Sequence, residues 1–152
     1  MAEVKIYWSE FRKGMMAESA VNELNTVLQE EFRLNFSEGN HAQQMSFYAK
    51  WMLNDILSKE FSFKNALATF KKDAHGKPSI EHQNLHFNLS HSKEIIGIAI
   101  SEKATVGIDV QVIKKYSEGV ANKIFSESEI AQYMNSNERE KFFFDTWSKK
   151  EA

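Results

Sequence analysis

The sequence predicts an α+β fold arranged in two layers. Three observations support this prediction: a strand-like run at the start, two stretches of helical periodicity after it, and alternating runs in the middle that give way to helical patterns again. Strands and helices that occur in separate blocks along the chain favour α+β over a regular alternation of strand and helix.

The first part of the chain is predicted to form one strand and two helices. Residues 4–8 are β-branched and aromatic, which favours a strand. Residues 16–32 and 41–57 carry apolar side chains at helical spacing. Both stretches are therefore expected to be amphipathic helices whose apolar faces belong to the core.

The middle of the chain predicts three strands, and the end predicts two helices. Residues 85–90 alternate and residues 95–100 are almost continuously apolar, which indicates a hairpin whose second strand is buried on both faces. Residues 106–111 alternate again and are expected to form a third strand. Helices are expected from about Ser126 and from about Asn137 to the end.

Composition excludes several classes of protein. Lys and Arg total 19 and Asp and Glu total 21, so the net charge of −2 argues against binding to nucleic acid through bulk positive charge. The chain contains no cysteine, which excludes disulfides, thiolate metal sites and a cysteine nucleophile. No apolar run approaches the roughly 20 residues of a membrane span, and a signal peptide is not evident. We expect a soluble, cytoplasmic protein.

Two segments carry oxygen-bearing side chains in a pattern that suits a metal. On a strand over residues 106–111, Asp109 and Gln111 point to the same face, and Gly107 leaves room for a ligand. Such oxygens suit Mg²⁺, although on this strand alone a solvated polar face of a half-buried sheet is the simpler explanation. On the last helix, Glu151 shares the face of Phe143 and Trp147, unless the helix end is frayed and solvated.

Two further segments suit a phosphate. Ser90 and His91 lie where the chain leaves a strand, and Gly76, Lys77 and Pro78 form a stiff loop with one cation. A polar turn is the alternative in each case. Ser90 and His91 are adjacent and so do not form a catalytic triad.

Two other features have simple structural explanations. Ser126 and Glu129 match a capping box, so Glu129 needs no catalytic role. A zinc site is disfavoured, because His82 and His86 fall in a loop that runs into a strand.

Four motifs in order closely resemble the 4′-phosphopantetheinyl transferases, of the surfactin-synthetase-activating type. They are His75-Gly76-Lys77-Pro78, His86-Phe87-Asn88-Leu89-Ser90-His91-Ser92, Val106-Gly107-Ile108-Asp109-Val110-Gln111 and Trp147-Ser148-Lys149-Lys150-Glu151-Ala152. The resemblance implies transfer of the phosphopantetheine arm of coenzyme A to a serine of an apo carrier protein, with release of adenosine 3′,5′-bisphosphate.

The resemblance also implies roles for individual residues. Asp109, Gln111 and Glu151 correspond to the positions around Mg²⁺, and Lys150 to a lysine near the pyrophosphate. Glu151 is also the candidate base for the carrier serine, acting directly or through a metal-bound water. The positions that contact coenzyme A are Gly76, Lys77, Pro78, Ser90 and His91.

Members of this family have two similar subdomains related by a pseudo-twofold axis, with coenzyme A between them. We therefore expect an N-terminal subdomain over residues 1–103 and the start of a second over residues 104–152. The second is expected to be incomplete, because the final helix has no terminating Gly, Pro or polar tail. The full-length protein is expected to be a monomer.

The sequence departs from the family in three ways, and two of them, Gln111 and the early end of the chain, favour an alternative: a non-catalytic module that binds coenzyme A or a carrier protein. Gln111 stands where many relatives carry Glu, which removes a negative ligand. The cations for the 3′-phosphate are hard to match: Arg33 and His41 are guesses, and Gln44 falls near an expected cation. The third departure is the early end of the chain.

Overall fold

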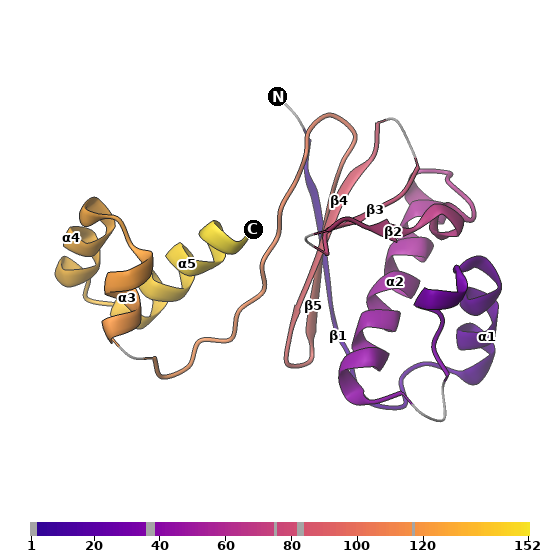
Figure 1. The fold of residues 1–152 in the computed structure, drawn as a ribbon, viewed down its shortest axis with the longest axis horizontal. Coiled ribbons are helices and arrows are strands. Elements are labelled where there is room, and N and C mark those ends of the chain that lie inside the picture. Colours follow the sequence, from indigo (N-terminus) through magenta and orange to yellow (C-terminus); the bar gives the residue numbers. More distant parts are fainter. Residues whose placement is uncertain (1–2, 36–38, 75, 82–83, 117) are drawn as a thin grey trace.

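A computed structural model describes residues 3–35, 39–74, 76–81, 84–116 and 118–152 of the chain. His75 and His82, which the sequence analysis named, lie outside the described residues. The elements confirm the α+β class, with a sheet, helices on one of its faces and a separate group of helices after it (Figure 1). Within the described part, no helix combines the length and apolar character that crossing a membrane requires.

The principal sheet has three antiparallel strands in the order β1-β5-β4. They are β1 (Lys5–Glu10), β4 (His86–Ser92) and β5 (Ile95–Ser101). The predicted hairpin is confirmed, since β4 pairs with β5 from His86 opposite Ser101 to Ser92 opposite Ile95. The continuous apolar run forms β5, which lies in the centre of the sheet and is buried along most of its length, as predicted.

Two helices cover one face of this sheet. Helix α1 (Glu18–Val27) is shorter than predicted, because Leu28 is extended and a 3₁₀ turn, η1 (Glu30–Phe32), follows it. Helix α2 (His41–Glu60) begins at a capping box formed by Asn40 and Gln43 and runs three residues beyond the prediction. Their apolar faces and β5 form one core, which includes Val21, Leu24, Leu53, Leu57, Ile96, Ile98 and Ile100.

Short elements that the sequence did not predict connect α2 to β4. They are the 3₁₀ turn η2 (Ala66–Thr69) and a two-stranded sheet of β2 (Lys71–Lys72) and β3 (Pro78–Ser79). Strands of two residues carry too little alternation to be recognised in a sequence.

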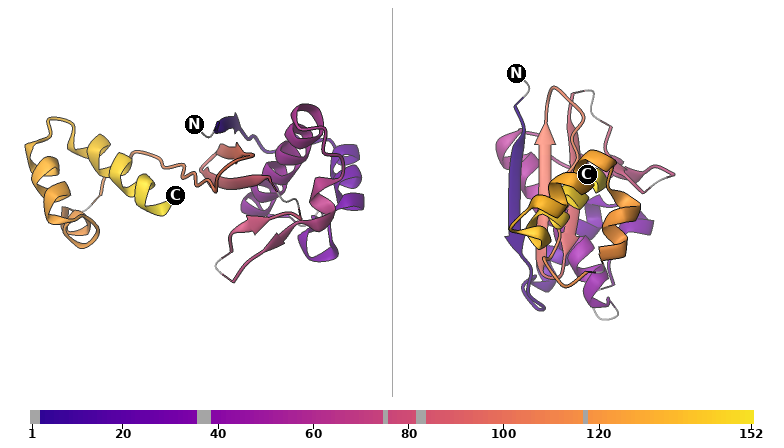
Figure 2. Two further views of the ribbon diagram at one scale, coloured as in Figure 1. Left: turned by 90° about the horizontal axis from the view of Figure 1, so that it is seen from above. Right: turned by 90° about the vertical axis from the view of Figure 1, so that its left-hand side faces the viewer.

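Three helices at the end of the chain form a second core. They are α3 (Glu118–Ile124), α4 (Glu127–Asn135) and α5 (Arg139–Glu151), and α3 was not predicted. Their core contains Ala121, Phe125, Tyr133, Phe143 and Phe144. This helical group lies on the other side of the sheet from α1 and α2 (Figures 1 and 2). The predicted capping box is present, since Ser126 N donates to Glu129 Oε2 and Glu129 N donates to Ser126 Oγ.

The third strand that the sequence predicted over residues 106–111 is wrong. This segment is extended, but it belongs to neither sheet. Ile108 N donates to Asn88 Oδ1 at 3.0 Å and Val110 N donates to Ser90 Oγ at 3.0 Å. Because these amides bond to side chains of β4, the segment crosses the face of the sheet and does not extend its edge. We refer to residues 106–111 as the crossing segment.

Candidate functional site

The crossing segment is held on β4 and β5 by apolar and polar contacts. Its apolar residues Ile108 and Val110 pack over Gly97, where a Cβ atom would come within 3.0 Å of Ile108 Cδ1 and 2.8 Å of Val110 Cγ2. Gly97 therefore leaves the space that the segment fills. Asp109, between these two apolar residues, also reaches β4, because its Oδ1 accepts a hydrogen bond from Ser90 Oγ.

Ser90 and Asp109 meet where β4 carries the crossing segment. Ser90 Oγ donates to Asp109 Oδ1 at 3.2 Å, while the same oxygen accepts the Val110 amide. The second carboxylate oxygen, Asp109 Oδ2, is buried and has no hydrogen-bond partner among the described residues. A buried carboxylate oxygen without a partner is costly unless a donor or cation reaches it.

This arrangement fits a hard divalent cation at Asp109. A carboxylate oxygen that is free of hydrogen bonds, beside a hydroxyl, belongs to the oxygen donor set that Mg²⁺ prefers. The described residues do not, however, bring three Asp, Glu or His side chains together into a complete metal cluster. Asp109 is therefore the one predicted metal position whose surroundings in this structure fit a metal.

The end of α5 approaches the crossing segment at Gly107. A Cβ atom at residue 107 would overlap the backbone oxygen of Ala152 and lie 3.3 Å from the Ala152 Cα. The sequence predicted that Gly107 leaves room for a ligand, and in this structure the backbone of Ala152 lies in that space. Glu151 and Gln111, the two other predicted metal positions, are both exposed.

Substituting Gly107 with alanine is expected to separate α5 from the crossing segment, because the added methyl group takes the place of the Ala152 carbonyl. Nuclear Overhauser contacts between residues 107 and 152 should disappear, while those within the sheet persist. The control is Thr105→Ala, at an exposed position two residues earlier. Unchanged contacts in the Gly107 variant would contradict this packing.

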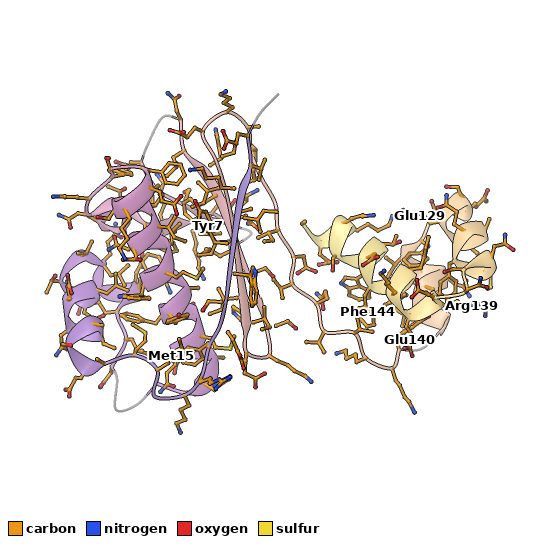
Figure 3. The ribbon with its side chains drawn as sticks, turned by 180° about the vertical axis from the view of Figure 1, so that it is seen from behind. Tyr7, Met15, Glu129, Arg139, Glu140 and Phe144 are labelled. Carbon is orange, nitrogen blue, oxygen red and sulfur yellow. The ribbon has the colours of Figure 1, made fainter. Side chains whose placement is uncertain are left out.

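Lys150 points to a partner that the sequence analysis did not assign to it. Its Nζ lies 3.0 Å from Glu129 Oε2. Figure 3 shows Glu129 within the helical group. Hydrogen bonds from the Ser126 amide and then from Lys150 hold the pKa of the Glu129 carboxyl below its ordinary value. Glu129 therefore both caps α4 and pairs with Lys150.

The predicted loop of Gly76, Lys77 and Pro78 joins β2 to β3. Gly76 has a φ of +82°, a backbone conformation that favours glycine. The turn is closed by Lys77 N, which donates to Asp73 Oδ1 at 2.8 Å. Lys77 Nζ reaches the Val106 carbonyl at 3.4 Å, so the loop is attached to the start of the crossing segment.

Ser90 and His91 are adjacent on β4 and lie on opposite faces. Ser90 faces the crossing segment, whereas His91 lines a cavity beside α2 together with Gly76 and Lys50. Sequence reasoning missed Lys50. The feature of the sequence that could have indicated it is a lysine directly after Phe47, Tyr48 and Ala49, within a stretch of α2 that is buried.

Comparisons with known proteins find similarity to one family of transferases. The sequence profile described as the 4′-phosphopantetheinyl transferase superfamily matches residues 105–152, which include the crossing segment and α5. This part of the chain is therefore similar to that superfamily. It is 29% identical over 104 residues to the 4′-phosphopantetheinyl transferase ffp of Bacillus subtilis, covering 66% of this chain and 46% of that protein.

Other relatives in this superfamily have the same coverage pattern. The chain is 31% identical to the 4′-phosphopantetheinyl transferase gsp of Aneurinibacillus migulanus, covering 70% of this chain and 45% of the relative. It is 27% identical to the 4′-phosphopantetheinyl transferase Sfp of Bacillus subtilis strain 168, covering 66% of this chain and 46% of that protein. These matches agree with the surfactin-synthetase-activating type. The chain spans less than half the length of these relatives.

Proposed function

We propose that this chain carries the site for transferring the 4′-phosphopantetheine arm of coenzyme A to a serine of an apo carrier protein. The named relatives support the reaction class. The observation that carries the proposal to particular residues is the Ser90–Asp109 contact, in which one carboxylate oxygen is buried and has no partner among the residues that the structure describes. The reaction is proposed to depend on Mg²⁺ and to take place in the cytoplasm, with no membrane or nucleic acid involved.

In the proposed reaction the carrier serine oxygen forms a bond to the phosphorus that bears the pantetheine arm. The bond from that phosphorus to the bridging oxygen breaks, and adenosine 3′,5′-bisphosphate leaves with the electron pair. Glu151 is proposed to accept the serine proton, because its exposed carboxylate at the end of α5 is accessible to a second protein. Asp109, Gln111 and Glu151 would hold Mg²⁺, which when bound supplies positive charge beside the diphosphate.

The remaining predicted residues are proposed to bind coenzyme A. Gly76, Lys77 and Pro78 would border the nucleotide, and Ser90 would contact the diphosphate on the Asp109 side of β4. Because His91 faces the other side, it would contact a different phosphate. For Lys150 to contact the diphosphate, its ammonium must leave Glu129, with which it pairs in this structure.

The subdomain division at residues 103 and 104 is also part of the proposal. It is supported by the two separate cores, one before the crossing segment and one in α3–α5. As a full-length protein the molecule is proposed to be a monomer.

The test is the intact mass of an apo carrier protein after incubation with coenzyme A, Mg²⁺ and this chain. We expect a gain of one phosphopantetheine group together with adenosine 3′,5′-bisphosphate, and we expect EDTA to abolish both. If coenzyme A binds and no carrier protein gains mass, the chain is the non-catalytic binding module and the transfer proposal is wrong.

Replacing Gln111 with glutamate tests the metal assignment separately. A second carboxylate two residues from Asp109 is expected to lower the Mg²⁺ concentration for half-maximal transfer by about three- to tenfold, because a charged oxygen ligand replaces a neutral one. Gln111 is exposed, so the fold should tolerate the change. A control, Ser136→Glu, adds the same charge in a loop of the helical group. An Mg²⁺ titration that is identical for Gln111→Glu and the unsubstituted chain would remove residue 111 from the site.

A further inference from the structure

An ion pair joins the beginning of α4 to the end of α5. Glu129 lies in the first turn of α4 and Lys150 in the last turn of α5. Lys150 Nζ lies 3.0 Å from Glu129 Oε2, and the Lys150 and Glu129 side chains are 37% and 29% exposed. A helix N-terminus favours negative charge and a helix C-terminus favours positive charge, so both helix ends stabilise this arrangement of charges.

The Glu129 carboxylate has two separable roles in this arrangement. Its Oε2 accepts a hydrogen bond from Ser126 N at 2.7 Å, which caps α4, and the same oxygen pairs with Lys150. The cap requires only an oxygen acceptor, which a glutamine also provides. The attraction for the Lys150 ammonium requires the negative charge. Glu129→Gln therefore removes the ion pair and keeps the cap.

Lys150 belongs to the part of α5 that approaches the crossing segment. Two residues later, the backbone of Ala152 lies where a Cβ atom at Gly107 would be. Gly107 is in turn two residues before Asp109, whose Oδ2 is buried and has no partner among the described residues. The lysine that the proposed function assigns to the diphosphate therefore lies next to the contact between α5 and the crossing segment, while its ammonium is bound to Glu129.

We propose that Glu129 competes with the diphosphate of coenzyme A for the Lys150 ammonium and thereby limits the affinity of this chain for coenzyme A. The inference rests on the proposed function, because it takes Lys150 as the lysine that contacts the diphosphate. A diphosphate carries more negative charge than one carboxylate, so a bound diphosphate attracts the ammonium more strongly than Glu129 does. Glu129 is then a positioning residue that acts through Lys150.

Calorimetric titration of the full 152-residue chain with coenzyme A and Mg²⁺ tests this role. Glu129→Gln is expected to bind coenzyme A about two- to fivefold more tightly, because Lys150 no longer has to leave a carboxylate and a partly exposed ion pair contributes only modestly. Glu127→Gln is the matched control, since it removes the same charge from an exposed side chain in the same helical turn and should leave the affinity unchanged.

A double-substitution cycle shows whether the effect passes through Lys150. In a Lys150→Met chain, Glu129→Gln should change the affinity for coenzyme A by less than about 1.5-fold, because the ammonium for which the two anions compete is absent. Direct repulsion between Glu129 and the diphosphate would instead give the same gain in both backgrounds. That result, or an affinity that Glu129→Gln does not raise, would overturn the inference.

Two further readouts distinguish competition from a structural role of the ion pair. In transfer assays, Glu129→Gln should lower the KM for coenzyme A by about two- to fivefold and leave kcat within about twofold, because the pair exists only before the diphosphate binds. The carbon-13 signal of the Glu129 carboxyl should move, as coenzyme A is added, toward its position in Lys150→Met. A signal that stays in place while coenzyme A binds contradicts the competition.

The outcomes separate this inference from the proposed function. A chain that transfers the arm, but whose affinity for coenzyme A does not respond to Glu129→Gln, contradicts the role of Glu129 alone. Tighter binding in Glu129→Gln by a chain that transfers nothing contradicts the proposed transfer alone. A chain that does not bind coenzyme A contradicts both.

Discussion

Asp109→Ala is expected to lower the rate of phosphopantetheine transfer by at least about 100-fold, the size of effect seen when a charge-stabilising group is removed from a transfer site. The substitution removes the acceptor for the Ser90 hydroxyl and the buried carboxylate oxygen, which has no partner within the described part of the chain. The measurement is the initial rate at which an apo carrier protein gains mass at saturating coenzyme A and Mg²⁺.

Two further variants show which property of Asp109 matters. Asp109→Asn retains an oxygen that accepts from Ser90 but has no charge, so it should be nearly as inactive as the alanine variant. Asp145→Asn removes an exposed carboxylate on α5 and should keep the original rate. Transfer within about threefold of the original rate in both Asp109 variants would exclude this carboxylate from the metal site.

Lys50→Met is expected to stabilise the protein at neutral pH by on the order of 3 kcal/mol, the difference that corresponds to a pKa of about 8 in the folded protein against the ordinary value of 10.5. Between these two values the unfolded chain holds more protons than the folded one. The free energy of unfolding of the unsubstituted protein therefore rises with pH across this window, and it is lowest where Lys50 is charged in both states.

The measurement is urea unfolding of both proteins at pH 7 and at pH 10.5, followed by circular dichroism. The difference between Lys50→Met and the original chain should be largest at pH 7 and should shrink at the higher pH. Lys59→Met, at an exposed position, should differ from the original chain by less than about 1 kcal/mol at either pH. A Lys50 variant that is less stable at pH 7, or a difference in unfolding free energy that does not change with pH, would contradict the account of Lys50 as a destabilising buried charge.

Much of the fold could be predicted from local patterns. The hairpin of β4 and β5 and the helix α2 follow from apolar periodicity, which reports the burial of a whole element. The crossing segment has the same alternation as a strand, but its amides bond to Asn88 and Ser90 side chains. Periodicity shows which side chains share a face and does not show what the backbone bonds to, so the predicted third strand was wrong.

The candidate site was less accessible to local reasoning. The alternation predicted that Asp109 and Gln111 share a face. In the structure only Asp109 is partly buried, because its carboxylate contacts Ser90, which is nineteen residues earlier in the sequence. The ion pair between Lys150 and Glu129 joins two helices that are separate in the sequence, so local patterns do not predict it. From the sequence, Glu129 was explained by the capping box alone. Lys50 was overlooked because a single lysine within an amphipathic helix ordinarily extends its amine to solvent.

The claim that joins these observations is that Asp109, on the crossing segment, holds a divalent cation close to the end of α5. Mn²⁺, a paramagnetic substitute for Mg²⁺, tests it through the broadening of backbone amide signals in the presence of coenzyme A. We expect selective loss of the signals of residues 90, 107–111 and 150–152, and we expect Asp109→Ala to prevent it. Broadening centred elsewhere, or the same broadening in Asp109→Ala, would contradict the account.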